Sequence, residues 1–180
     1  MSTSITLEEL IVFLLGAPMF GDLDETELSQ IVHLMQVQYL RAGQVVFREG
    51  TAGDAWYVVY AGSVEVFTGG MGASERPLAT IGPPGCFGEM AILDGSPRVA
   101  TVRAREASTV LKFPREGFER LIRDGNLAAY KLVYHMAKVL AARQRGVTQR
   151  LNEVLAQQEY AEHRTRGRPG PTCRSCRATG

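Results

Sequence analysis

Apolar positions near the N-terminus follow the three- and four-residue spacing of an amphipathic helix. They are Leu7, Leu10, Ile11, Leu14 and Leu15. Pro18 and Gly21 interrupt this spacing. A second short helix is predicted after the acidic run 24–27, because acidic side chains stabilise a helix N-terminus. Its apolar face consists of Leu28, Ile31, Val32 and Met35.

The pattern changes after residue 36, where short runs of β-branched and aromatic residues alternate with glycine and proline. Such runs, separated by turn residues, predict short strands. The predicted strands are Val37–Leu40, Val45–Arg48, Ala55–Tyr60, Ser63–Phe67, Arg76–Ile81, Ala100–Ala104 and Ser108–Phe113. Turn signals at intervals of about 8–12 residues are typical of an antiparallel barrel or sandwich.

Helical spacing returns after Pro114, first in a short helix that ends near Gly125. A long helix is then predicted from Leu127 to about Ala161. One side of this helix carries a heptad-like seam of Val133, Ala137, Leu140, Val147, Leu151 and Val154, which also contains Gln144. A seam of this kind favours pairing with a second helix. The alternative is that this face packs on the chain's own barrel.

The composition is that of an ordinary globular protein, with 45% hydrophobic and 22% charged residues. A net charge of +1 gives no general argument for binding nucleic acid or a membrane surface. Three cysteines do not form a disulfide framework, which indicates a reducing compartment. The apolar run 10–15 is too short to span a bilayer. No spacing of histidine, cysteine and carboxylate residues suggests a metal site or a catalytic dyad, so we expect neither.

Residues 163–180 are rich in arginine and glycine and contain no acidic residue, which predicts a flexible basic tail. Its arginines are either solvated or in nonspecific contact with nucleic acid or acidic lipid. Cys173 and Cys176 form a single pair. They are either incidental thiols, or they link two molecules by binding a shared zinc ion or by forming a disulfide.

The most informative segment runs from Gly85 to Val102. Gly85 and Gly88 allow the backbone to approach a ligand closely. A single helical turn after Gly88 would direct its first amides at an anion. Arg98 follows, and its guanidinium can bond two phosphate oxygens at once. Glu89 has the wrong charge for a phosphate but suits a pair of hydroxyl groups, as on a ribose. Together these residues predict a site for a compact nucleotide.

The run Phe87-Gly88-Glu89-x-Ala91-Ile92, followed by Pro97-Arg98-x-Ala100-Thr101, resembles the phosphate-binding cassette of cyclic nucleotide-binding domains. This family includes protein kinase A regulatory subunits, cyclic nucleotide-gated channels and the bacterial catabolite activator. Gly43, Gly50, Asp54 and Gly62 lie among the predicted strands as the family's turn residues do. The resemblance covers about residues 20–160. It implies an α+β fold in which an antiparallel, jelly-roll-like β-roll is flanked by N-terminal helices and a long C-terminal helix.

The resemblance also implies the roles of individual residues. Arg98 would pair with the cyclic phosphate, and Glu89 would accept a hydrogen bond from the ribose 2′-hydroxyl. Backbone amides of the cassette would surround the phosphate and the sugar, contributed by Gly88, Glu89, Ala91 and Ala100. Phe87, Met90 and Val99 complete the expected ligand-binding set in the cassette. Arg143 and Gln144 fall near the family's base-contacting helix positions.

Val99 departs from the family pattern, which places Ala, Ser, Thr or Gln after the arginine. A hydroxyl at this position helps to hold guanine, and valine has none, so we expect cAMP rather than cGMP as the ligand. The expected function is a cytoplasmic cAMP sensor without catalysis, which signals through its C-terminal helix to an effector protein. The alternatives are a cGMP-responsive sensor and a scaffold module whose nucleotide pocket is degenerate.

The expected organisation has three parts: N-terminal helices in 1–36, the β-roll with its lid and dimerisation helix in 37–162, and the tail in 163–180. The catabolite activator pairs its subunits through the long helix, so we expect a homodimer through residues 127–161. That activator also carries a DNA-binding helix-turn-helix after this helix. The tail is too short and too rich in glycine and arginine to form one. We therefore do not expect sequence-specific DNA binding.

Overall fold

The computed structural model describes residues 5–69 and 75–166, with side chains up to residue 157. Its first elements are the helix α1 (Leu7–Leu15), the 3-10 turn η1 (Pro18–Phe20) and the helix α2 (Glu25–Val32). Both helices begin with a capping box, formed by Thr6 with Glu9 and by Asp24 with Glu27. Each box pairs backbone amides that a helix start leaves without partners. The two predicted N-terminal helices are therefore confirmed, and η1 lies where the helical spacing is interrupted.

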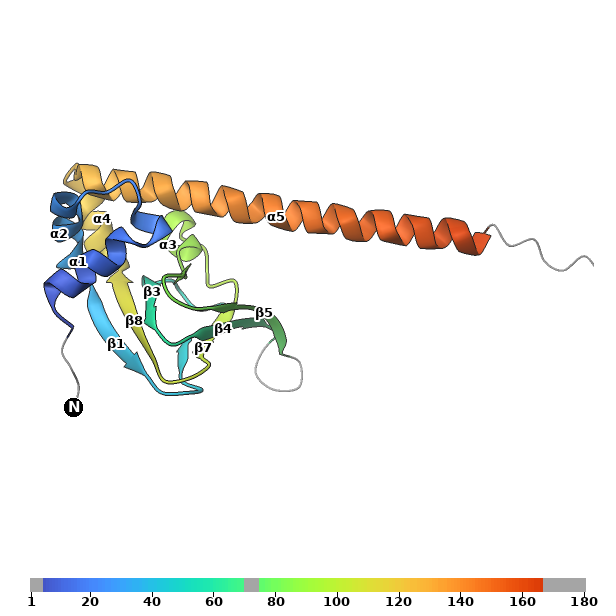
Figure 1. Cartoon of the computed structure of the whole chain (residues 1–180), viewed down its shortest axis with the longest axis horizontal. Coiled ribbons are helices and arrows are strands. Elements are labelled where there is room, and N and C mark those ends of the chain that lie inside the picture. Colours follow the sequence, from blue (N-terminus) through green and yellow to red (C-terminus); the bar gives the residue numbers. More distant parts are fainter. Residues whose placement is uncertain (1–4, 70–74, 167–180) are drawn as a thin grey trace, which may run out of the picture. The chain divides into compact units, whose positions relative to one another are not determined.

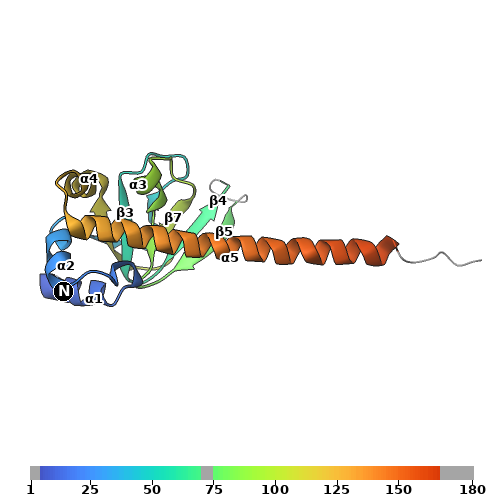
Figure 2. The same cartoon turned by 90° about the horizontal axis from the view of Figure 1, so that it is seen from above.

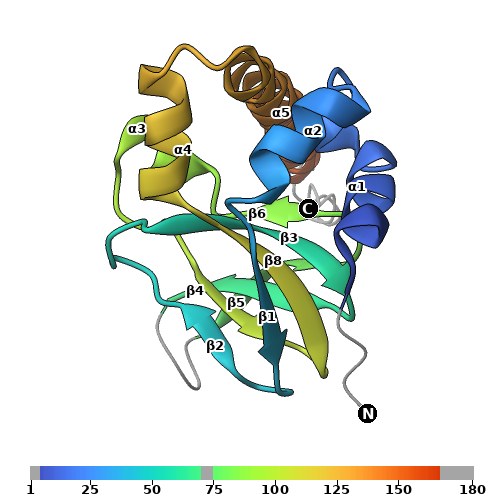
Figure 3. The same cartoon turned by 90° about the vertical axis from the view of Figure 1, so that its left-hand side faces the viewer.

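Within the described residues, eight strands form two four-stranded antiparallel sheets (Figures 1 and 3). They are β1 (Gln36–Leu40), β2 (Val45–Phe47), β3 (Ala55–Ala61), β4 (Val64–Thr68), β5 (Arg76–Ile81), β6 (Cys86–Phe87), β7 (Thr101–Ala104) and β8 (Ser108–Pro114). One sheet has the order β1-β8-β3-β6 and the other β2-β7-β4-β5. The seven predicted strands and the antiparallel β-roll are confirmed. The two-residue strand β6 was not predicted.

Three helices follow or interrupt the strands: α3 (Met90–Asp94), α4 (Arg115–Arg123) and α5 (Leu127–Arg166). The chain divides into two compact units, residues 1–139 and 140–180, so α5 begins in the first unit and continues in the second. Within the first unit, the start of α5 lies between α4 on one side and α1 and α2 on the other (Figures 2 and 3). The long C-terminal helix is confirmed.

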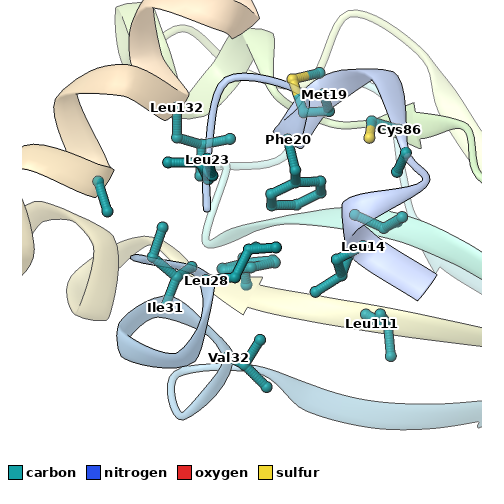
Figure 4. Packing of buried hydrophobic residues seen from close by; sticks show 14 of the residues in the cluster. Leu14, Met19, Phe20, Leu23, Leu28, Ile31, Val32, Cys86, Leu111 and Leu132 are labelled. Atoms are coloured by element: carbon teal, nitrogen blue, oxygen red, sulfur yellow. The ribbon is translucent and has the colours of Figure 1, made fainter. Parts of the chain in front are cut away.

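The first unit contains two hydrophobic clusters. The smaller fills the β-roll, with Tyr57, Val64 and Val102 among its members. The larger lies between the β1-β8-β3-β6 sheet and the helices, and Figure 4 shows Phe20 among Leu14, Leu23 and Leu28. Full burial of such side chains contributes about 1.5–3 kcal/mol each. The N-terminal helices are therefore part of the domain's core.

The start of α5 belongs to the larger cluster. Ala128, Ala129, Leu132 and Met136 are all buried there. Val133, the first residue of the predicted heptad seam, also packs against this cluster, so at this point the seam contacts its own domain. Outside the core, His135 Nδ1 lies 2.8 Å from Asp22 Oδ2. None of the helices in the described ranges combines the length and apolar character needed to cross a bilayer.

Candidate functional site

The cassette begins at β6, which pairs with β3 through Tyr57–Phe87 and Val58–Cys86. Gly88 follows in the left-handed region, with a φ of +80°. A Cβ atom at this position would lie 2.8 Å from Arg98 Nη1, which is shorter than a real Cβ contact. Glycine is therefore required here both by its backbone conformation and by the close approach of the arginine.

Arg98 is the central polar residue of the site and is 3% exposed. Its Nη1 donates a hydrogen bond of 2.8 Å to the carbonyl oxygen of Gly88. Its Nη2 donates to the carbonyl oxygen of Ala55 and, at 3.2 Å, to Asp54 Oδ1. The guanidinium carbon lies 4.0 Å from the ring centroid of Phe47, a cation–π arrangement. These contacts fix both the position and the plane of the guanidinium.

The Nε of Arg98 is buried and makes no hydrogen bond with any of the described residues. Buried donors in proteins are nearly always paired, so an unpaired one at a fixed guanidinium indicates a place for an acceptor from outside. A phosphate suits this position because guanidinium and phosphate form strong charge-assisted hydrogen bonds. The residues present therefore fit a phosphate-bearing ligand.

The backbone of Arg98 is held by the loop between β2 and β3. Arg98 N donates to the Thr51 carbonyl oxygen, and Gly50 N donates to the Arg98 carbonyl oxygen, both at 2.8 Å. In the same loop, a Cβ added to Gly53 would lie 2.4 Å from the Cβ of Ala91 on α3. The loop thus packs against α3 and bonds the arginine, which joins the two halves of the cassette.

Asp54 is the carboxylate of the site and contacts two cations. Besides Arg98, its Oδ2 accepts a hydrogen bond of 3.0 Å from Lys112 Nζ on β8. Burial raises the pKa of Asp54, but the hydrogen bond and charge of Lys112, a backbone hydrogen bond and the charge of Arg98 outweigh it and hold the pKa below the ordinary 3.8. Asp54 is therefore ionised at neutral pH.

Aromatic rings form one wall of the site. Phe87 stacks on Tyr57 with ring centroids 5.1 Å apart, and Phe47 contacts both rings. Burial, with a smaller effect of Asp54, raises the pKa of Tyr57 to about 12. Tyr57 is thus neutral throughout the physiological range, and the arginine lies beside an uncharged aromatic cluster.

Glu89 immediately precedes α3 and is 2% exposed. Its side chain makes no capping hydrogen bond to that helix. An acid at this position could simply stabilise the start of the helix. Glu89 does not do so through a capping hydrogen bond. The buried carboxylate is placed within the same short segment as Gly88 and Ala91.

The structure brings most of the predicted ligand-binding residues together in the cassette. Phe87, Glu89, Ala91, Arg98 and Ala100 are buried, Gly88 is half-buried, and Met90 and Val99 are exposed, Val99 by 58%. Arg143 and Gln144 are exposed residues of α5 and belong to the second unit, which is described separately from the cassette. The predicted tail begins at residue 163, but the backbone of α5 stays helical to Arg166, because the helix continues past the predicted end near Ala161. Cys173, Cys176 and the rest of the predicted tail lie outside the described residues.

Among the residues of the site that sequence reasoning missed are Phe47 and Lys112. Phe47 looked like an ordinary strand residue, and nothing in its spacing indicated that it stacks on a guanidinium. Lys112 did carry a signal, because it is a single charge between the apolar residues Leu111 and Phe113. No group of three or more histidine, cysteine and carboxylate residues within 5–69 and 75–166 is arranged to hold a metal ion.

Fold and site together define a β-roll domain with a buried arginine beside a glycine turn. Residues 37–124 match the cyclic nucleotide-binding domain family. This part of the chain is a domain of that family, as the cassette predicted.

The cyclic AMP receptor protein of Thermus thermophilus is 35% identical over 125 residues, which are 69% of this chain and 58% of that protein. The crystal structure of the Thermus thermophilus catabolite activator protein matches with a TM-score of 0.67 and 32% identity, over 77% of this chain and 63% of that chain. The co-crystal structure of the regulatory domain of Toxoplasma gondii PKA with cAMP matches with a TM-score of 0.58 and 30% identity, over 66% of this chain and 45% of that chain. This chain therefore spans only about half to two thirds of these relatives.

Proposed function

We propose that this protein is a cAMP sensor, a regulatory protein that binds the nucleotide without catalysing a reaction and acts in the cytoplasm. The observation that carries the proposal is the buried Arg98, whose guanidinium is fixed in place while its Nε has no partner in the part of the chain that the structure describes. Support also comes from relatives described as a cyclic AMP receptor protein and as a PKA regulatory domain with cAMP.

In this proposal, Arg98 binds the cyclic phosphate through its unpaired Nε. The backbone amides of Gly88, Glu89, Ala91 and Ala100 surround the phosphate and the sugar. Glu89 accepts a hydrogen bond from the ribose 2′-hydroxyl, which suits a buried carboxylate because a charged acceptor forms a strong hydrogen bond. Phe87 and Met90 complete the cassette.

The preference for cAMP over cGMP rests on Val99. Its side chain has no hydroxyl group to hold guanine, and its 58% exposure leaves it at the surface of the cassette. On α5, Arg143 and Gln144 are the proposed contacts of the base. A ligand that contacts this helix in only one of its arrangements shifts the population toward that arrangement. The changed helix surface then signals to an effector protein.

Isothermal titration calorimetry with cAMP and cGMP tests the proposal. The wild-type chain is expected to bind cAMP more tightly than cGMP, and Arg98→Ala should weaken cAMP binding by roughly 2–5 kcal/mol, as for a buried charge that loses its partner. Arg98→Lys should recover only part of this loss, because lysine lacks the planar fork.

Arg103→Ala is the matched control, since Arg103 of β7 is paired with Glu65 of β4 and with Glu75, which precedes β5. It should leave the affinity for cAMP unchanged. Thermal melting of every variant shows whether it folds. Equal binding by wild type and Arg98→Ala would remove the role assigned to Arg98. No binding or thermal shift at millimolar nucleotide would favour the scaffold alternative.

We also propose that the chain forms a homodimer through α5. Val147, Leu151, Val154 and Leu155 are each about half exposed on this helix, with values of 54%, 55%, 50% and 48%. Sedimentation velocity should give a dimer for the wild-type chain and a monomer for the Val147→Glu/Leu151→Glu variant. The control Gln149→Glu changes a polar position of the same helix and should remain dimeric. A monomeric wild type would exclude this assembly.

A further inference from the structure

Asp54 occupies a position between two cations that differ in burial. Its Oδ1 lies 3.2 Å from Arg98 Nη2 and its Oδ2 lies 3.0 Å from Lys112 Nζ. The side chain of Arg98 is 1% exposed, that of Lys112 20% and that of Asp54 65%. One carboxylate thus bridges the buried cation of the cassette and a second, more accessible cation on β8.

This bridge matters for any anion that binds Arg98. Nε and Nη2 lie on the same edge of a guanidinium, and that edge can bond two oxygens of a phosphate. On this edge Nε is unpaired, whereas Nη2 already bonds Asp54 and the Ala55 carbonyl oxygen. A phosphate at Nε therefore arrives beside the carboxylate of Asp54. The negative charges of the phosphate and of Asp54 would then lie side by side on one guanidinium edge. Their repulsion opposes binding of the phosphate.

Lys112 is placed to remove this repulsion. It lies on β8 opposite Tyr57 of β3, and its amine reaches the oxygen of Asp54 that does not contact Arg98. Its neighbours Leu111 and Phe113 are fully buried in the larger core cluster, so the strand is held independently of the lysine charge. When a phosphate replaces the Asp54 carboxylate at Nη2 of Arg98, Lys112 can still hold that carboxylate.

We propose that Lys112 is a positioning residue for the ligand phosphate: it binds and neutralises Asp54 and so sets the affinity of Arg98 for the anion. The inference rests on the proposed cyclic nucleotide site. Lys112 acts through Asp54 and does not itself contact the phosphate. Its effect on binding therefore exists only while residue 54 carries a negative charge.

A double-mutant cycle measured by calorimetry with cAMP tests this role. Lys112→Met should weaken cAMP binding about two- to fivefold, the range for a partly screened charge pair. In the Asp54→Asn background, the same Lys112→Met change should alter the affinity less than about twofold, because the charge to be neutralised is gone. Lys112→Arg should retain near wild-type affinity, since it restores the cation.

Lys131→Met is the matched control, because Lys131 pairs with Glu27 of α2, outside the cassette. It should not change the affinity. Melting temperatures exclude variants that fail to fold, and Lys112→Arg keeps the test decisive if Lys112→Met is unstable. Unchanged affinity in Lys112→Met overturns the inference. An equal loss in both backgrounds also overturns it, because Lys112 then acts independently of Asp54. If the wild-type chain binds no cyclic nucleotide, the proposed function fails first.

Discussion

Replacement of Gly88 by alanine tests how tightly the glycine turn is joined to Arg98. The φ of +80° at Gly88 is unfavourable for any residue with a Cβ, at a cost of about 1–2 kcal/mol. The new Cβ would also lie 2.8 Å from Arg98 Nη1 and 3.3 Å from Phe47 Cε1, so the guanidinium must shift. Loss of its hydrogen bond to the Gly88 carbonyl oxygen removes about 1.5–3 kcal/mol, as for other hydrogen bonds of charged groups. The expected destabilisation is about 2–5 kcal/mol.

Gly43 provides the control for backbone strain alone. Its φ is +78°, but a Cβ at this position has nothing within 4 Å. Gly43→Ala should therefore lose only about 1–2 kcal/mol. Urea unfolding of the whole chain can be followed by the fluorescence of Trp56, the only tryptophan, which is fully buried in the larger core cluster.

The difference between the two alanine variants measures the contact with Arg98. In the Arg98→Ala background the costs of the two substitutions should move closer together, because the atom nearest to the new Cβ at Gly88 is absent. Equal losses for Gly43→Ala and Gly88→Ala in the wild-type background would refute the reasoning, since the guanidinium would then not limit the space at Gly88.

Three further changes test other parts of the first unit. Gly53→Ala should destabilise the chain by about 1–3 kcal/mol, because the new Cβ would lie 2.4 Å from the Cβ of Ala91. Ala91→Gly should relieve part of that loss in the double variant. Additive effects of the two substitutions in urea unfolding would argue against the contact. Leu132→Ala, at a fully buried position of α5, should cost about 2–5 kcal/mol in the same assay, and a loss below 1 kcal/mol would place this residue outside the core. Asp22→Asn should lower the urea midpoint at neutral pH, because a hydrogen bond from His135 holds the pKa of Asp22 below 3.8 and the ionised Asp22 stabilises the fold above that pH. The difference in urea midpoint between variant and wild type should disappear as the pH falls through the folded-state pKa of Asp22. A difference that persists at pH 2 would contradict this role.

The order of the elements could be predicted because each kind of element imposes its own spacing on the sequence. The strand Arg76–Ile81 agrees with the structure at both ends, and the other six predicted strands differ by only one or two residues. The strand Cys86–Phe87 could not be predicted in this way, because two residues are too few to show a period. It pairs with β3 only through contacts distant in sequence.

The cassette could be recognised from its residue types, but the partners of its arginine could not. Arg98 bonds the carbonyl oxygens of Gly88 and Ala55, and every residue carries a carbonyl oxygen, so the sequence does not mark these acceptors. The stacking of Phe47 on the guanidinium likewise depends on how β2 approaches the cassette. What the sequence could predict was an arginine for a phosphate, and what it could not predict was the set of contacts that fixes its plane.

Asp54 shows why these contacts matter beyond the cassette itself. Its side chain bonds Arg98 and Lys112, while its carbonyl oxygen accepts a hydrogen bond of 2.8 Å from Arg115 N at the start of α4. The residue thus connects the guanidinium, strand β8 and helix α4 through three direct bonds. Arg98 cannot exchange Asp54 for a phosphate unless the side chain of Asp54 moves or turns to Lys112 alone. Strand β8 and the start of α4 are therefore the two elements outside the cassette that are bonded directly to the residue such an exchange would move.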